Sequence, residues 1–320
     1  MATNPEQNLK HGMKCFPVTP RKLEEPKFNG VDFDGTDAVD VFNYAIQKFK
    51  SVTKDKSASP MLKARAEAWL GYAYAIAHSE RWDFNPDQKN REEDEWLESE
   101  LLGAARDLVK QATGDPQGTR HFDTHWAKAA VYMYLARNTK DWNTAEGAYL
   151  EAEKLARGKK TILRDLHYEM ADFYTHRNNT GDLDEAVRLC KAEKPAYDWH
   201  RHQEAWCQFL EARNLANDNE KKKKYTQAIA TLKSMKPDCQ ESHLCVSMLL
   251  KTACHHERAK FLTGWERQEE EALAWGSLEQ FRHHACFRKW TRENFTKYAP
   301  FRKQADRRYW QGLWRELKCA

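Results

Sequence analysis

Alanines recur along this chain at nearly constant spacing, and that spacing constrains the fold more than any other feature. They occur in the second helix of each expected helix pair, at Ala104, Ala145, Ala186, Ala228 and Ala272, with intervals of 41, 41, 42 and 44 residues. A fixed period of this length is typical of arrays in which one supersecondary unit stacks on the next. Because a small side chain lets two helix axes approach closely, the period predicts stacked helical hairpins.

The first helix of each expected pair carries a matching set of alanines. Ala130, Ala171 and Ala212 are separated by 41 and 41 residues. Short gaps such as 114–118 and 178–182 separate segments rich in Ala, Leu, Glu and Lys, which favour helix over strand. We therefore expect an all-α fold, an α-solenoid of about five antiparallel hairpins.

Two segments carry a resemblance to a known family. Ala145, Tyr149 and Ala152 share one helix face, and with them DWNTAEGAYLEAEKLA resembles the second helix of a tetratricopeptide repeat. The segment AEAWLGYAYAIA is similar to the family's first helix through its aromatic and small residues Trp69, Gly71 and Tyr72. The resemblance covers roughly residues 60–275, with longer helices or loops than the family's usual repeat of about 34 residues. It implies a concave face that binds peptides or protein segments.

Proline content and charge suggest three regions. Residues 1–36 contain four prolines and no sustained helical period, so we expect an extended N-terminal leader. Residues 37–280 form the expected repeat domain. Residues 281–320 form an expected basic, aromatic helical cap, whose apolar stripe consists of Trp310, Leu313, Trp314 and Leu317 at helical spacing.

The charge of the C-terminal region permits a second interpretation. Residues 281–320 contain eleven basic and three acidic residues. Cations that alternate with aromatic rings suit RNA or single-stranded nucleic acid, because the cations neutralise phosphates while the rings stack on bases. The cations that would form this site are Arg288, Lys289, Arg292, Arg302, Lys303, Arg307 and Arg308. A buried stripe and an exposed set of arginines are compatible with each other.

Opposite charges at two places in the chain also suggest self-association. Residues 80–100 contain nine acidic and three basic residues, in contrast to the basic C-terminal region. Attraction between these segments in different protomers would produce a head-to-tail homo-oligomer.

The leading hypothesis is a non-catalytic scaffold or adaptor that binds a protein or peptide through its repeat surface. The polar and aromatic positions expected to line the groove are Tyr132, Arg137, Tyr168, Asp172, Arg213 and Asn214.

Catalytic and cofactor motifs are absent from the sequence. The segment Gly158–Thr161 is only superficially similar to a phosphate loop and is expected to end one helix and begin the next. An enzyme remains an alternative, with a site that includes His283, His284 or Cys286. No cofactor is expected.

Histidine and cysteine clusters are the candidates for metal sites in this sequence. His121 and His125 stand four residues apart and could share one helix face, but Asp123 and Thr124 between them suit a helix N-cap, which we favour. The group between Cys239 and His256 lacks paired metal-ligand spacing and is expected to pack within a helix. We expect no metal.

The remaining signals concern location. The sequence shows no apolar run of membrane-spanning length and no secretory signal, so we expect a cytoplasmic protein with reduced thiols. The run Lys221–Lys224 is expected to be a solvated turn between helices.

Overall fold

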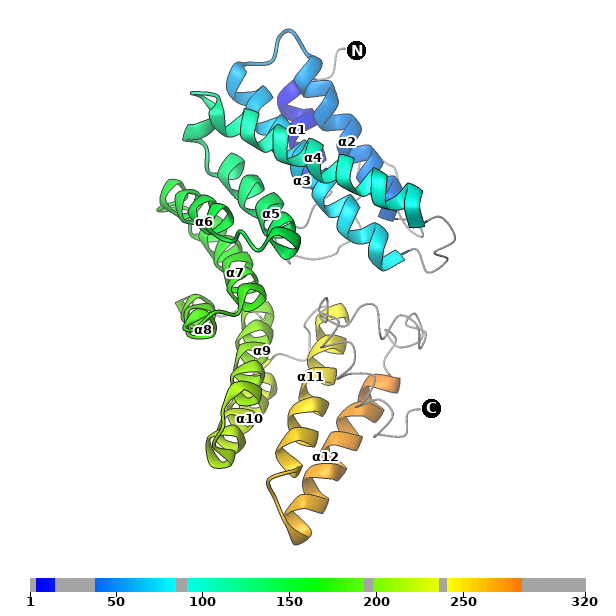
Figure 1. Ribbon diagram of the computed structural model, residues 1–320, viewed down its shortest axis with the longest axis vertical. Coiled ribbons are helices and arrows are strands. Elements are labelled where there is room, and N and C mark those ends of the chain that lie inside the picture. Colours follow the sequence, from blue (N-terminus) through cyan, green and yellow to red (C-terminus); the bar gives the residue numbers. More distant parts are fainter. Residues whose placement is uncertain (1–3, 15–37, 85–90, 193–197, 236–240, 284–320) are drawn as a thin grey trace. The chain divides into compact units, whose positions relative to one another are not determined.

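The computed structural model describes residues 4–14, 38–84, 91–192, 198–235 and 241–283, and these ranges contain helices and no strand (Figure 1). Within them, the α-helices are α1 (Pro5–Lys14), α2 (Ala38–Lys54), α3 (Pro60–Phe84), α4 (Arg91–Gly114), α5 (Phe122–Thr139), α6 (Asn143–Leu155), α7 (Lys160–Arg177), α8 (Asp182–Ala192), α9 (Asp198–Asn214), α10 (Asp218–Lys233), α11 (Glu241–Ala259) and α12 (Gly264–His283). A short 3-10 helix, Gly118–Arg120, precedes α5. The predicted all-α class is confirmed.

The chain divides into two compact units, residues 1–166 and 167–320, and the boundary falls within α7. In the first unit, α3 is the central helix and packs against α2, α4 and α5. Trp69 and Ala73 on α3 are buried together with Val109 on α4 and Val131 on α5. Consecutive helices therefore share one core in this unit.

Gly71 packs closely against α4. A Cβ atom at this position would lie 2.8 Å from the carbonyl oxygen of Ala105 and 2.9 Å from Cγ1 of Val109. The glycine that the sequence placed in a repeat-like pattern thus allows the backbones of two helices to pack closely.

The N-terminal residues depart from the predicted extended leader, because residues 5–14 form helix α1. The start of this helix has a clear local cause. The side-chain oxygen of Asn4 accepts a hydrogen bond of 3.0 Å from the backbone N–H of Glu6. Pro5 stands at the first helical position, where its missing N–H has no helical partner to lose. The sequence Asn-Pro-Glu is a helix-start signal. The prediction of an extended leader rested on the number of prolines and did not take this signal into account.

Packing also holds α1 in place. Leu9 is buried, and Gly12 lies so close to α2 that an added Cβ atom would meet the ring of Phe49 at 2.5 Å. Residues 15–36, the rest of the predicted leader, lie outside the described residues.

The recurring alanines are confirmed as buried at most, but not all, of the expected positions. Ala145, Ala186 and Ala228 are fully buried, as are Ala130, Ala171 and Ala212 in the first helices. Ala104 and Ala272 are exposed, so the prediction was wrong there. The buried alanines nearby are Ala105, which lies against Gly71, and Ala274. The spacing of buried alanines is consequently less regular than the sequence suggested.

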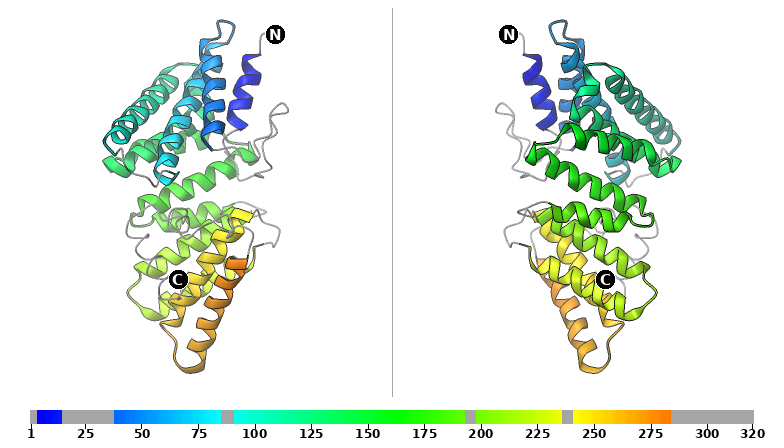
Figure 2. Two further views of the ribbon diagram at one scale, coloured as in Figure 1. Left: turned by 90° about the vertical axis from the view of Figure 1, so that its right-hand side faces the viewer. Right: turned by 90° about the vertical axis from the view of Figure 1, so that its left-hand side faces the viewer.

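The second unit is built from hairpins of neighbouring helices. The helix α9 packs against α8, α10 and α11, and α11 packs against both α10 and α12. Its core contains a row of aromatic rings: Trp206 stacks on Phe209 at 5.5 Å between centroids, and Phe209 lies 5.8 Å from Tyr225. The helices α11 and α12 run side by side in each view of the structure (Figure 2).

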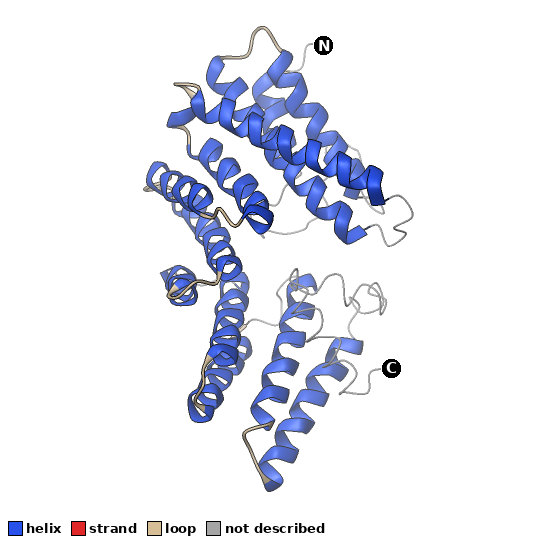
Figure 3. Ribbon diagram, viewed as in Figure 1, coloured by secondary structure: helices blue, strands red, loops and turns tan. Residues whose placement is uncertain are grey.

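Two turns agree with the sequence, and one does not. The predicted break at 178–182 lies between α7 and α8, which a loop connects (Figure 3). Gly158 has a positive φ of 82° between α6 and α7. The run Lys221–Lys224 was expected in a turn but belongs to α10. Asn217 begins that helix, since its side-chain oxygen accepts hydrogen bonds from the N–H groups of residues 219 and 220.

Across the described ranges, no helix combines the length and the apolar character needed to cross a membrane.

Candidate functional site

The residues predicted to line a groove have different environments. Tyr168 and Asp172 are half-buried on α7, where Tyr168 packs edge-on against the ring of His200 and Asp172 lies 3.4 Å from Nδ1 of His176. Arg213 is exposed at the end of α9, with its guanidinium 5.9 Å from the ring of Phe209.

Among the remaining predicted positions, one residue lines a pocket. Tyr132 is half-buried on α5 in the first unit, and the side chain of Arg137 lies outside the described part of the structure. Asn214 is exposed and lines a pocket. Of the predicted positions, Asn214 is the one that lines this pocket of the second unit, as far as the described side chains show.

The pocket belongs to the second unit and has a volume of about 440 Å³. Ligand-binding clefts typically enclose about 300–1,000 Å³, so its size is sufficient for a ligand or for a few residues of a peptide. Its walls are the α7–α8 turn, the start of α8, the end of α9 with the residue after it, and one residue of α10: Asn178, Asn179, Thr180, Gly181, Leu183, Asp184, Glu211, Asn214, Leu215 and Lys224.

An ion pair fixes the conformation of the α7–α8 turn. Nε and Nη2 of Arg177 donate hydrogen bonds of 2.9 and 2.7 Å to the two carboxylate oxygens of Asp182. The same carboxylate accepts a bond of 2.7 Å from the backbone N–H of Asn179. Asp182 is buried, and a bidentate pair of this kind holds both groups in one geometry. The turn is thus preformed.

The backbone of this turn needs residues that tolerate positive φ. Asn178 has a φ of 51° and Gly181 a φ of 84°, and asparagine and glycine are the residues that adopt this region most readily. These dihedral angles let the chain reverse within four residues. Asn178, Asn179 and Thr180 are exposed as a result.

The opposite wall is closed by an ion pair between α9 and α10. Nζ of Lys224 contacts the carboxylate of Glu211, and both side chains are partly buried. This pair neutralises the two charges inside the pocket wall. Leu183 and Leu215 add apolar surface to the lining.

Neutral amides give the pocket its chemical character. Asn178, Asn179 and Asn214 all line it, and their side-chain amides make no hydrogen bond with any other residue that the structure describes. Each amide offers two donors and one acceptor oxygen. The pocket therefore presents unused hydrogen-bonding groups of both kinds.

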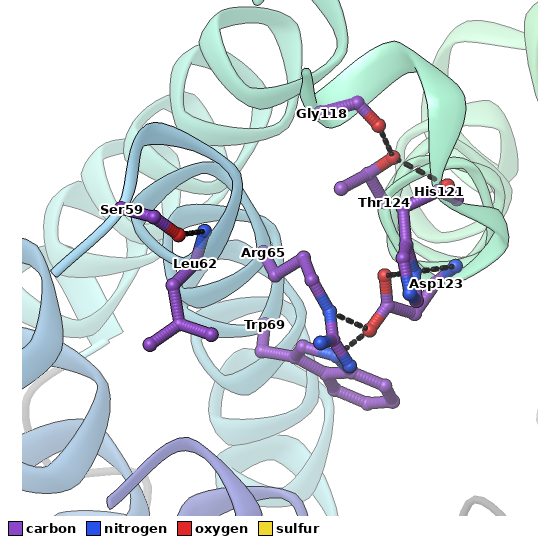
Figure 4. Close-up of polar contacts among 8 residues, drawn as sticks. All are labelled: Ser59, Leu62, Arg65, Trp69, Gly118, His121, Asp123 and Thr124. Carbon is purple, nitrogen blue, oxygen red and sulfur yellow. Dashed lines mark hydrogen bonds and ion pairs between the residues drawn. The ribbon is translucent and has the colours of Figure 1, made fainter. Parts of the chain in front are cut away.

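A second polar cluster lies in the first unit, around the buried carboxylate of Asp123 (Figure 4). Nε of Arg65 donates a bond of 2.8 Å and Nε1 of Trp69 a bond of 3.3 Å to the same oxygen of Asp123. His121 contacts the other oxygen. Burial opposes ionisation of this carboxyl, but the bond with His121 and the charge of Arg65 outweigh it and lower the pKa of Asp123.

This geometry corrects the predicted helix cap. The N-cap of α5 is His121, whose Nδ1 lies 3.4 Å from the backbone nitrogen of Asp123. Asp123 instead joins α3 to α5, and the hydroxyl of Thr124 donates to the carbonyl of Gly118 at 2.6 Å. His125 contacts the carbonyl oxygen of Thr119 at 2.9 Å. The cluster joins α3 to α5 through the carboxylate of Asp123.

A third cluster joins α11 to α12. The buried carboxylate of Glu270 lies 2.8 Å from Nδ1 of His255 and accepts a bond of 2.9 Å from Nε of Arg258. Burial lowers the pKa of His255, so the neutral imidazole is favoured. This pair holds α11 against α12.

Buried thiols and a buried imidazole complete the polar groups of the second unit. Cys190, Cys207 and Cys254 are free and buried. Burial raises the pKa of Cys207 to about 12, so its thiol is a poor nucleophile. Burial also lowers the pKa of His202 to about 4, and its Nδ1 lies 3.0 Å from the hydroxyl of Ser247.

Several predicted positions fall outside the described residues. The cations proposed for nucleic acid, together with His284 and Cys286, lie in residues 284–320, and the side chain of His283 is not described. The same holds for the acidic side chains of residues 80–100. Within the part of the chain that is described, no three His, Cys, Asp or Glu side chains group as a metal site would require.

Most of the pocket lining is not evident from the sequence. The sequence predicted a gap between helices at Asn178, Asn179 and Thr180 and a turn at Lys224. The available signal was the cluster of turn residues followed by an acidic helix start at Asp182. That signal predicts the turn, but the sequence does not show that the turn faces the end of α9.

Comparisons with protein-family models, curated proteins and solved structures found no significant match to this chain. The resemblance to tetratricopeptide repeats therefore stays a prediction, and the site is interpreted from its own geometry.

Proposed function

We propose that this protein is a non-catalytic scaffold or adaptor that holds an extended peptide segment of a partner protein in the pocket beside Asn214. The observation that carries the proposal is the convergence of three unpaired amides, from Asn178, Asn179 and Asn214, on one preformed pocket, as counted among the described residues.

The chemistry of these side chains favours a peptide backbone as the ligand. An extended peptide exposes N–H donors and C=O acceptors along its length, and an asparagine amide can pair with both. Leu183 and Leu215 supply apolar contact for a side chain of the peptide. The charges of Glu211 and Lys224 compensate each other, and Asp184 leaves the lining with one carboxylate that a donor group of the peptide can meet.

The wider architecture in this proposal is a tetratricopeptide-like solenoid with residues 281–320 as its C-terminal cap. The packing of consecutive helices within each unit supports the stacking of hairpins. A cytoplasmic location and a protein partner belong to the same proposal.

Peptide display on the purified full-length chain tests the binding function. We expect random peptides to be enriched, and a synthetic copy of an enriched peptide to bind in a fluorescence anisotropy titration. Asn214→Ala and Asn178→Gly should each weaken this binding about fivefold, the equivalent of one lost hydrogen bond of about 1 kcal/mol. Glycine is chosen at position 178 because it retains the positive φ while removing the amide.

Gln227 provides the matched control. It is an exposed amide on α10 outside the pocket lining, so Gln227→Ala should leave the affinity unchanged. Equal affinity in all three variants and the unmodified chain would contradict binding at the pocket.

Charge at the C-terminus supports a second candidate, binding of RNA or single-stranded nucleic acid by residues 281–320. A filter-binding titration with a single-stranded oligonucleotide should then show steep salt dependence and a loss of binding in the double variant Arg307→Glu, Arg308→Glu. An affinity for the oligonucleotide that changes neither with salt concentration nor in the double variant would exclude this candidate.

A further inference from the structure

The helix α12 carries an apolar face that points away from its packing partner. Within the described residues α12 packs on α11, and it does so through the side that includes Ala274 and Leu278, which are buried. The opposite half of the helix presents Trp265, 71% exposed, with Leu273 and Trp275 at 41% and 42%. Two tryptophans and a leucine on one half of a helix are an uncommon exposed surface.

Acidic residues lie on and beside this face. Glu266 and Glu269 are exposed, as is Glu271, which pairs with Arg267 at 2.8 Å. This face of α12 therefore combines exposed apolar side chains with neighbouring negative charges. A segment that fits it would present an apolar stripe flanked by positive charges.

We propose that residues 310–317 of the same chain cover this face of α12. The stripe of this segment consists of Trp310, Leu313, Trp314 and Leu317, and the region that contains it has eleven basic and three acidic residues. Apolar side chains would meet Trp265, Leu273 and Trp275, while the cations would lie near Glu266 and Glu269. This inference specifies the receiving surface of the proposed cap and is independent of what the pocket binds.

The length of the connecting chain permits this contact. The described part of the chain ends at His283, the last residue of α12, and Trp265 lies near the other end of that helix. A helix of 20 residues is about 30 Å long. Residues 284–309 span up to roughly 90 Å when extended and about 40 Å when helical. Either form reaches back along α12.

Charge disfavours two other ligands for this face of α12, a second copy of the chain and a nucleic acid. A second copy that placed its own α12 face here would bring acidic surrounds together, and a nucleic acid would meet the same repulsion. The segment 310–317 is joined to the receiving helix, so its effective concentration is also high.

Hydroxyl-radical footprinting of the full-length chain tests the contact, with oxidation of Trp265 and Trp275 measured by mass spectrometry. We expect oxidation at both positions to be several-fold faster in the double variant Trp314→Glu, Leu317→Glu than in the unmodified chain. Gln311→Glu adds a negative charge off the stripe and should leave both rates unchanged. Trp69 and Trp206 are buried, and slow oxidation of these two residues shows that each variant remains folded.

Equal oxidation rates at Trp265 and Trp275 in the unmodified chain and the double variant would overturn the proposal. Protection that disappears on dilution would also overturn it, because such protection comes from a second copy. Neither result changes the peptide titration at the pocket, so the two proposals fail separately.

Discussion

Replacement of Gly71 by alanine tests the close approach of α3 and α4. The added Cβ atom would lie 2.8 Å from the carbonyl oxygen of Ala105 and 2.9 Å from Val109 Cγ1, so a backbone group of α4 must move. Overpacking in a core costs about 1–3 kcal/mol, while alanine improves helix propensity by about 0.5–1 kcal/mol. We expect Gly71→Ala to lower the free energy of unfolding by about 1–2 kcal/mol.

The matched control lies on the neighbouring helix. A Cβ atom at Gly103 of α4 meets nothing within 4 Å, so Gly103→Ala gains helix propensity without a clash and should stabilise by up to about 1 kcal/mol. Urea denaturation followed by circular dichroism measures both variants against the unmodified chain. A Gly71→Ala protein as stable as the Gly103→Ala protein would refute the close helix contact.

Three further predictions concern other buried contacts. Asp123→Ala removes the buried partner of Arg65 and should cost about 3–5 kcal/mol in urea denaturation, and a loss below about 1 kcal/mol would contradict that pairing. Since burial depresses the pKa of His202 from 6.5 to about 4, its neutral form stabilises the fold above pH 6.5, and this stability is lost as pH falls toward 4. We expect a loss of roughly 2 kcal/mol between pH 7 and pH 5 that is absent in His202→Gln, and parallel pH profiles would refute the assignment. Gly12→Ala should release α1 from Phe49 and speed amide exchange of residues 5–14, whereas unchanged exchange would argue against this contact.

The helical class and most of the hairpin packing could be predicted, because small residues at helix crossings leave a periodic record in the sequence. Ala130, Ala171 and Ala212 show this, since all three are buried where the period placed them. The period failed at Ala104, because Ala105 follows it directly and successive helical residues point about 100° apart. Spacing alone does not decide which of two adjacent alanines faces the neighbouring helix.

The pocket was less predictable, because it depends on contacts between segments distant in sequence. Asn214 was among the expected groove residues, but its neighbours in the pocket come from the α7–α8 turn and from Lys224 on α10. A local pattern, Asn217 ahead of Asp218, marks the true start of α10 and places Lys224 within the helix. The approach of the turn to the end of α9 results from tertiary packing.

Hydrogen–deuterium exchange of the full-length chain, with and without an enriched peptide, tests peptide binding at this site most directly. We expect the peptide to slow exchange in residues 178–184, where the exposed turn lines the pocket, and to leave α3 and α4 unchanged. Slower exchange confined to other segments, with residues 178–184 unaffected, would contradict the proposed site.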